Sequence, residues 1–161
     1  YYFPQECLLS LYYAPFYSHL VYGLEFWSAS NNTLQNQVKL IQKKAIRIIT
    51  KSHYLAHTAP LADSLNILLY DNLVFVIKCV FMFKVYYNKT CKQVIELFSK
   101  CNNSRTRHGS INFVVQRDIL LCRKRFIVHC GVILWNSLPS AIRTITSEHM
   151  FKSKLRTHII L

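Results

Sequence analysis

Carboxylates, thiols and imidazoles build most catalytic sites, and their spacing in this chain offers none. No two of the seven Asp and Glu residues are closer than eight residues in sequence. Nucleotidyl transfer by two metals needs carboxylates that converge on cations about 4 Å apart. The sequence contains no Asp-Asp pair and no Gly-rich phosphate loop. We therefore expect no catalytic residue and no cofactor here.

Metal ligands are also poorly spaced. Zinc fingers place paired cysteines two to four residues apart, whereas the closest pair here, Cys122 and Cys130, is eight apart. His53 and His57 have the i, i+4 spacing that a helix uses for zinc, but the glutamate that follows the first His in the zinc-protease motif is missing. A helix-terminal or loop role fits these histidines better, and we expect no metal.

Binding chemistry remains, and it is cationic. The chain has 20 Lys and Arg residues against 7 Asp and Glu residues, a net charge of +13. Such an excess attracts polyanions, nucleic acid first and an anionic membrane surface second. The alternative is charge that serves only solubility.

The clearest group of cations lies in a helix predicted over residues 33–51, capped by Asn32 or Thr33. Apolar residues at helical spacing form a stripe that we expect to face the core: Leu34, Val38, Ile41, Ala45 and Ile48. On a helical wheel the opposite side carries five cations: Lys39, Lys43, Lys44, Arg47 and Lys51.

No carboxylate lies between Glu25 and Asp63. A face that is merely solvated usually mixes both signs of charge, so the pattern favours contact with a polyanion. The alternative is a solvated outer face of a core helix. Tyr54, beside Lys51, is the better candidate for stacking on an unpaired base, because most other aromatic residues lie in apolar runs typical of a core.

A second basic patch is predicted downstream. The polar segment 101–110 is interpreted as an exposed loop with Arg105 and Arg107 at its tip. Three consecutive cations follow later: Arg123, Lys124 and Arg125.

These residues must be positioned by a mainly α fold. Hydrophobic residues make up 52% of the chain and charged residues 17%, which argues against disorder. Three Gly and four Pro are too few for the turns of an all-β sandwich. We expect one compact helical domain over residues 1–161, with amphipathic and buried helices and room for one short β-hairpin around 111–128. Helices are predicted in 7–27 (divided at Pro15), 33–51, 58–69, 73–87, 92–100, 131–138 and after Ser147.

The two most apolar segments are poor membrane spans. Segment 7–27 contains His19 and Glu25, and segment 73–87 has fifteen residues that include two lysines. A bilayer needs about 20 apolar residues. A small membrane-associated protein anchored by these segments is the alternative. Six cysteines without a secretory signal indicate reduced thiols and an intracellular location, nucleus or cytoplasm.

Three stretches carry a family resemblance: LYYAPFYSHLVYGLEFW (11–27), LIQKKAIRIITKSHYLAHTAPL (40–61), and GVILWNSLPSAIR with FKSKLRTHIIL (131–143 and 151–161). In order and spacing they resemble the region after the polymerase palm of non-LTR (LINE-like) retrotransposon reverse transcriptases. The run LWNSLP is specific because polar and apolar positions agree together. Its members are interpreted as structural: Trp135, Asn136, Leu138 and Pro139.

The resemblance implies that this chain is the C-terminal part of an RNA-directed DNA polymerase whose fingers, palm and thumb lie upstream. Its implied partners are those upstream domains, template RNA and chromosomal target DNA. The chain starts at Tyr1, without Met, as a downstream piece would. Departures from the family pattern, such as Ala62 after Pro60-Leu61 and Val132 after Gly131, leave a degraded, non-functional transposon remnant as a further alternative.

Overall fold

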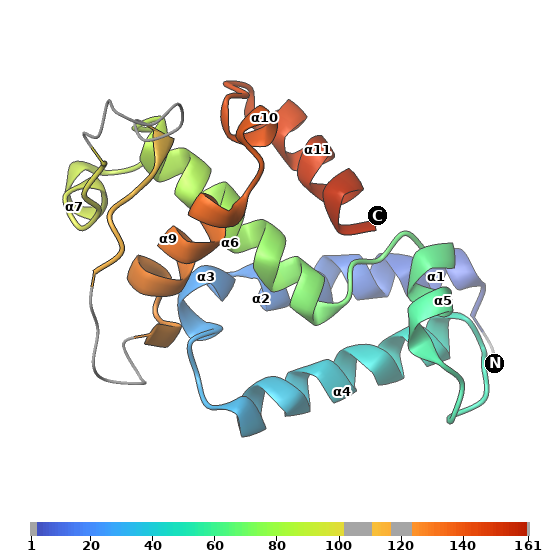
Figure 1. Ribbon diagram of the computed structural model, residues 1–161. Coiled ribbons are helices and arrows are strands. Elements are labelled where there is room, and N and C mark those ends of the chain that lie inside the picture. The colour runs from blue at the N-terminus through green and yellow to red at the C-terminus, as the bar shows by residue number, and fades with distance from the viewer. Residues whose placement is uncertain (1–2, 102–110, 117–123, 161) are drawn as a thin grey trace. The chain divides into compact units, whose positions relative to one another are not determined.

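The computed structural model describes residues 3–101, 111–116 and 124–160. These residues form helices joined by short connections (Figure 1), which confirms the mainly α fold. The elements are α1 (Gln5–Leu11), η1 (Tyr12–Tyr17), α2 (Ser18–Val21), α3 (Leu24–Trp27), α4 (Asn32–Ile49), α5 (Thr58–Ser64), α6 (Tyr70–Tyr86), α7 (Lys92–Ile95), α9 (Ile127–Ser137), α10 (Ser140–Arg143) and α11 (Glu148–Ile160).

The chain divides into two compact units, Tyr1–Val74 and Phe75–Leu161. The sequence pattern predicted one domain without an internal linker. The boundary between the units falls inside helix α6, whose first turn belongs to the first unit and whose remaining turns belong to the second.

In the first unit, the proline that was expected to divide segment 7–27 lies inside a continuous helical run. Pro15 lies in η1, a π-helical stretch between α1 and α2. Proline lacks an N–H and crowds the preceding turn, and a wider turn accommodates it. The Ser18 hydroxyl donates to the carbonyl oxygens of Ala14 and Pro15, the latter at 3.0 Å, so side-chain bonds supplement the backbone ladder at this point.

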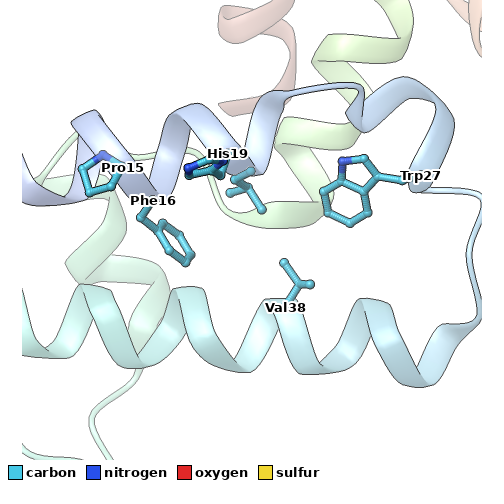
Figure 2. Close-up of a pocket in the computed structure, with 6 residues that line it drawn as sticks. Pro15, Phe16, His19, Trp27 and Val38 are labelled. Carbon is cyan, nitrogen blue, oxygen red and sulfur yellow. The ribbon is translucent and has the colours of Figure 1, made fainter.

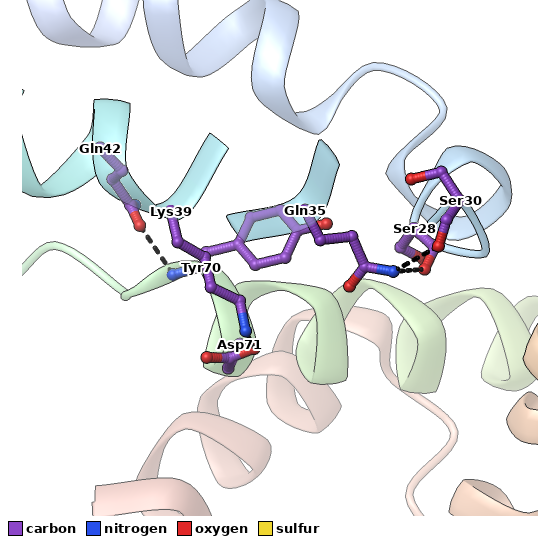
Figure 3. A network of polar contacts seen from close by, with 7 residues as sticks. All are labelled: Ser28, Ser30, Gln35, Lys39, Gln42, Tyr70 and Asp71. Carbon is purple, nitrogen blue, oxygen red and sulfur yellow. Dashed lines mark hydrogen bonds and ion pairs between the residues drawn. The ribbon is translucent and has the colours of Figure 1, made fainter. Parts of the chain in front are cut away.

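The interior of the first unit contains a buried amide, Gln42, which is 1% exposed. Its Nε2 donates to the Tyr12 hydroxyl at 3.0 Å and to the Leu68 carbonyl at 2.9 Å. Its Oε1 accepts from the Tyr70 backbone N–H at 2.7 Å, at the first residue of α6 (Figure 3). One side chain of α4 therefore fixes η1, the 65–69 connection and the start of α6. Apolar residues surround this amide: Ile46, Ile49, Ala62 and Ile67.

The second unit is built around aromatic rings. Trp135 of α9 stacks on Tyr86 of α6 with ring centroids 5.3 Å apart. Phe151 of α11 stacks on Phe83 of α6 at 4.6 Å. Phe113 meets the Trp135 and Tyr86 rings edge-on. Phe151 and Leu155 lie four residues apart, on one face of α11, and both are fully buried.

The hairpin expected around 111–128 does not form in the described residues. Segment 111–116 makes a single isolated antiparallel bridge, between Phe113 and Lys100. Ile127 already belongs to α9, so the end of the predicted hairpin is helical. The alternation of INFVV was misleading because side chains of α9 and α10, Asn136 and Arg143, bind Phe113 and Asn112, where a second strand of a hairpin would have bound them.

Across 3–101, 111–116 and 124–160, no helix is both long enough and apolar enough to cross a bilayer.

Candidate nucleic-acid interface

Helix α4, Asn32–Ile49, was expected to carry the main cationic face. It begins one residue earlier than predicted, and its cap is Asn31, whose side chain accepts from the Thr33 N–H at 3.3 Å. The helix presents Gln42, Ile46 and Ile49 to the core.

The predicted inward stripe of α4 is therefore wrong in direction. Leu34, Ile41 and Ile48 are 55%, 52% and 50% exposed, and only Val38 and Ala45 are partly buried. The wheel was misread because the buried face includes a polar residue, Gln42. Pattern analysis counts a glutamine as solvent-facing, whereas three hydrogen bonds make its burial favourable here.

Two of the five cations of the predicted face are engaged. Lys39 Nζ lies 2.7 Å from Asp71 Oδ1 (Figure 3) and 5.7 Å from the centroid of the Tyr70 ring. Arg47 Nε donates to the Ala56 carbonyl at 2.9 Å. The ion pair with Asp71 neutralises the charge of Lys39. The hydrogen bond to the Ala56 carbonyl restrains the Arg47 guanidinium but leaves its charge unneutralised.

The other three cations of the predicted face are Lys43 and Lys44 of α4 and Lys51, which follows the helix because α4 ends at Ile49, two residues earlier than predicted. None of the three has an ion-pair partner within the part of the chain that the structure describes. Lys44 and Lys51 are exposed, and Lys43 is partly buried. Lys43 and Lys44 are interleaved with the exposed apolar residues of α4. The resulting surface is basic and apolar at once, unlike the purely cationic face that the wheel suggested.

Only part of the second predicted patch can be placed. Arg105, Arg107 and Arg123 lie outside the described residues. Lys124 and Arg125 are exposed and immediately precede α9. The amino end of a helix carries a partial positive charge, so these two cations add to a potential that already favours anions.

Positive charge is distributed unequally between the two units, which per-residue motif analysis missed. Residues 75–161 contain fifteen of the twenty Lys and Arg residues and three of the seven carboxylates, a net charge of +12. Residues 1–74 contain five cations and four carboxylates, a net charge of +1. Counting charge by half of the sequence would have revealed this difference.

Few of the described cations of the second unit are neutralised. Lys84 and Lys152 share one carboxylate, Glu148, at 3.7 and 2.6 Å. The hydrogen bond from Lys152 lowers the pKa of Glu148, and the charges of the two lysines act in the same direction. Among the described residues, several exposed cations of this unit have no ion pair: Lys92, Lys124, Arg125, Lys154 and Arg156.

Two further lysines lie on aromatic rings. Lys89 Nζ is 4.9 Å from the Phe83 ring centroid and donates to the Thr146 carbonyl. Lys100 Nζ is 4.8 Å from the Tyr86 ring and donates to the Tyr86 carbonyl at 2.8 Å. Carbonyl groups and ring faces hold these ammonium groups in place but leave their full charge.

The LWNSLP motif holds the extended segment against α9. Trp135 Nε1 donates to the Ile111 carbonyl at 2.9 Å. Asn136 pairs with both backbone groups of Phe113, accepting from its N–H at 3.0 Å and donating to its carbonyl at 2.9 Å. Leu138 is buried, and Pro139 is the N-terminal capping residue of α10.

Arg143, at the end of α10, is 6% exposed and has no carboxylate partner in the described residues. Its guanidinium donates to Asn112 Oδ1, while its Nε has no hydrogen-bond partner. Burial lowers the pKa of this guanidinium. A buried cation beside neutral groups adds to the positive potential of the unit.

The remaining candidates do not form a site with their neighbours. Tyr54 is exposed, and its ring lies 4.5 Å from that of His53. The His53 Nδ1 accepts from the Leu55 N–H. Within the described ranges, no three His, Cys, Asp or Glu side chains are grouped as metal ligands.

The chain matches no family model, no curated protein and no solved structure. The class of the protein is therefore defined by its own features, a mainly α chain of two helical units in which most of the positive charge belongs to the second.

Proposed function

We propose that this chain is a non-catalytic accessory segment of a retrotransposon RNA-directed DNA polymerase. In this role it binds template RNA or target DNA through its cations. The proposal is supported by the resemblance of its three sequence stretches and by one structural observation, the weak neutralisation of the described cations within residues 75–161.

That observation fits phosphate recognition. Lysine and arginine bind phosphates by charge and by release of the counterions that surround nucleic acid, largely independently of sequence. In the second unit one carboxylate, Glu148, serves two lysines, and the exposed cations near α7, α9 and α11 have no described ion pair. A surface with this imbalance binds a polyanion whose own charge replaces the missing carboxylates.

The five cations of the predicted α4 face contribute a smaller share in this proposal. Of the five, only Lys39 has an ion pair among the described residues, but the first unit as a whole is nearly neutral. We therefore assign the larger part of phosphate binding to Lys154, Arg156, Lys124 and Arg125, and the smaller part to Lys43, Lys44 and Lys51.

Binding of a labelled single-stranded RNA and of duplex DNA, measured by fluorescence anisotropy over a range of salt concentrations, tests this function. We expect a Kd on the order of 10⁻⁴ to 10⁻⁶ M at physiological salt, with little sequence preference. Each phosphate contact contributes about 0.7 to the logarithmic salt slope for a single strand. Salt-independent binding, or no binding of either polymer, would contradict the proposal.

Three double variants with the same loss of charge locate the contact. Lys154→Gln with Arg156→Gln removes unpaired cations of the second unit, and should lower the slope by up to about 1.4. Lys44→Gln with Lys51→Gln removes unpaired cations of the predicted α4 face and should have a smaller effect. The matched control, Lys39→Gln with Lys152→Gln, removes cations that already face carboxylates.

The control should change the slope least, because Asp71 and Glu148 already compete with phosphate for those two lysines. Equal effects from all three variants would indicate nonspecific attraction by net charge.

Two further measurements distinguish the proposed function from the other two interpretations, a degraded remnant and a membrane-associated protein. A broad, non-cooperative thermal transition would favour a degraded remnant, and flotation with vesicles of neutral phospholipid would favour a membrane-associated protein.

A further inference from the structure

The face of α4 that was predicted to be buried is instead exposed, and it has the geometry of a seam between helices. Leu34, Ile41 and Ile48 follow one another at intervals of seven residues and are each about half exposed. Val38 and Ala45 lie between them and are partly buried. The alternating steps of four and three residues are those of the a and d positions of a coiled coil.

An apolar groove borders this seam within the first unit. Val38 faces Phe16 and Trp27 across a cavity of about 480 Å³, with Pro15 and His19 on the same side as Phe16 (Figure 2). Leu20 also lines the cavity. Sites that bind apolar groups have volumes of roughly 300–1,000 Å³. The groove can therefore receive a large apolar side chain from whatever lies along the seam.

Charge on the seam is one-sided. In the heptad register that places Val38 and Ala45 at a, Lys44 occupies a g position, where coiled coils form ion pairs with the partner helix. Lys51 follows the end of α4 in left-handed backbone, so it flanks the seam beyond the helical register. Both are exposed and have no ion pair with a described residue. The opposite flank, at the e positions, is formed by Gln35, Gln42 and Ile49, which face the unit's own interior.

We infer that this surface docks an acidic amphipathic helix. Its apolar residues would lie along Leu34, Ile41 and Ile48, one large side chain would enter the Phe16–Trp27 groove, and its carboxylates would face Lys44 and Lys51. Helix α4, with 18 residues, extends for about 27 Å, which matches about five turns of partner helix.

A second copy of this chain fits less well. Two α4 helices in contact would bring together two surfaces that carry lysines and no carboxylate, and like charges oppose pairing. Nucleic acid fits less well at this seam because the exposed isoleucines offer no phosphate ligand. The inference shares Lys44 and Lys51 with the proposed binding of RNA or DNA, but that binding depends mainly on residues 75–161, and the apolar residues of the seam have no part in it.

The test uses the full chain and a designed probe, a 21-residue helical peptide with Leu and Ile at a and d and Glu at e and g. Trp27 lines the groove and is one of two tryptophans, whereas Trp135 is fully buried. Peptide binding should therefore change the emission of Trp27. The matched control peptide has Lys in place of every Glu and should bind at least about tenfold more weakly.

The chain offers a matched pair of variants. Ile41→Gln with Ile48→Gln removes two exposed seam residues and should weaken binding by about tenfold or more. Leu40→Gln alters a residue that is equally exposed, at 56%, but lies off the seam, and should change the affinity less than about twofold. Lys44→Glu with Lys51→Glu should reverse the preference from the Glu peptide to the Lys peptide.

Circular dichroism confirms that each variant is folded, and the RNA affinity of Ile41→Gln with Ile48→Gln should stay at the wild-type value. The inference is overturned if the seam variant binds the Glu peptide normally or if both peptides bind alike. It is also overturned if Ile41→Gln with Ile48→Gln abolishes self-association of the chain, or its capture by anionic vesicles, and leaves the affinity for the Glu peptide unchanged. Loss of RNA binding alone would overturn the proposed function and leave this inference intact.

Discussion

The two helical units hold their elements together with different chemistry. Residues 1–74 bury one glutamine amide whose three hydrogen bonds join η1, the 65–69 connection and α6. Residues 75–161 bury stacked aromatic rings supplied by α6, α9 and α11. Their charges differ as well, at +1 and +12. A nearly neutral unit with an exposed apolar seam suits a protein partner, and a strongly cationic unit suits a polyanion.

The largest expected effect concerns the aromatic core. Trp135→Ala should lower the free energy of unfolding of the second unit by about 3–5 kcal/mol. The change removes the stack on Tyr86 and the hydrogen bond to the Ile111 carbonyl. Hydrogen exchange followed by mass spectrometry should show faster exchange in 124–160 than in the wild type.

Trp27→Ala is the matched control, because Trp27 is partly buried beside an open groove. It should cost only about 1 kcal/mol. Equal losses from the two tryptophans would remove the distinction between an aromatic core in one unit and a polar one in the other.

The helices were largely predictable from sequence, whereas the buried side of α4 was not. Periodicity predicted a helix over 33–51 and an apolar run predicted one over 73–87, and α4 and α6 match these segments to within a few residues at each end. The burial of Gln42 depends on three partners that are 26 to 30 residues away. No local sequence pattern contains those partners. A helical wheel based on polarity therefore assigned the wrong face of α4 to the core.

The candidate site shows the same limit. Sequence identified which residues are cations but could not show that Lys39 faces Asp71, thirty-two residues later. It also did not anticipate that the motif residue Asn136 binds the Phe113 backbone. Ion pairs and amide contacts between distant segments are set by tertiary structure, which composition does not encode locally.

A middle-sized effect should follow from the buried amide. Gln42→Ala leaves the Tyr70 N–H, the Leu68 carbonyl and the Tyr12 hydroxyl without their partner. Each buried polar group left unsatisfied costs up to about 1–3 kcal/mol. We expect the total loss in free energy of unfolding to be about 3 kcal/mol. Denaturant unfolding monitored by Trp27 fluorescence measures this loss in the free energy of unfolding.

Gln35→Ala provides the comparison on the same helix. Its Nε2 donates to the Ser28 and Ser30 carbonyls near the surface (Figure 3), where water can replace it. The expected cost is about 0.5–1 kcal/mol. If Gln35→Ala destabilised the chain as much as Gln42→Ala, the buried amide would have no special role in the first unit.

The smallest effect concerns the carboxylate shared by Lys84 and Lys152. Because the folded state lowers the pKa of Glu148 from its ordinary 4.5, its stabilising contribution is present above that value and is lost as pH falls through the lowered pKa. The pair is partly exposed, so the contribution should be under about 1 kcal/mol.

Thermal unfolding of the wild type and of Glu148→Gln between pH 3 and pH 7 tests this directly. The difference in Tm should be present at pH 7 and should vanish toward pH 3. A difference that persists unchanged at low pH would mean that Glu148 contributes through packing and not through its charge.

The hydrogen bonds of Asn136 also bear on self-association of the protein. The extended stretch around Phe113 bonds to residues 99–101 along one edge, while the Asn136 amide and the Trp135 indole occupy hydrogen-bonding groups along the other. An extended segment with an open edge is a template on which another chain can add a strand. The Asn136 carboxamide occupies both backbone groups of Phe113 on that edge. Its loss would leave these groups free to pair with an extended segment of another molecule.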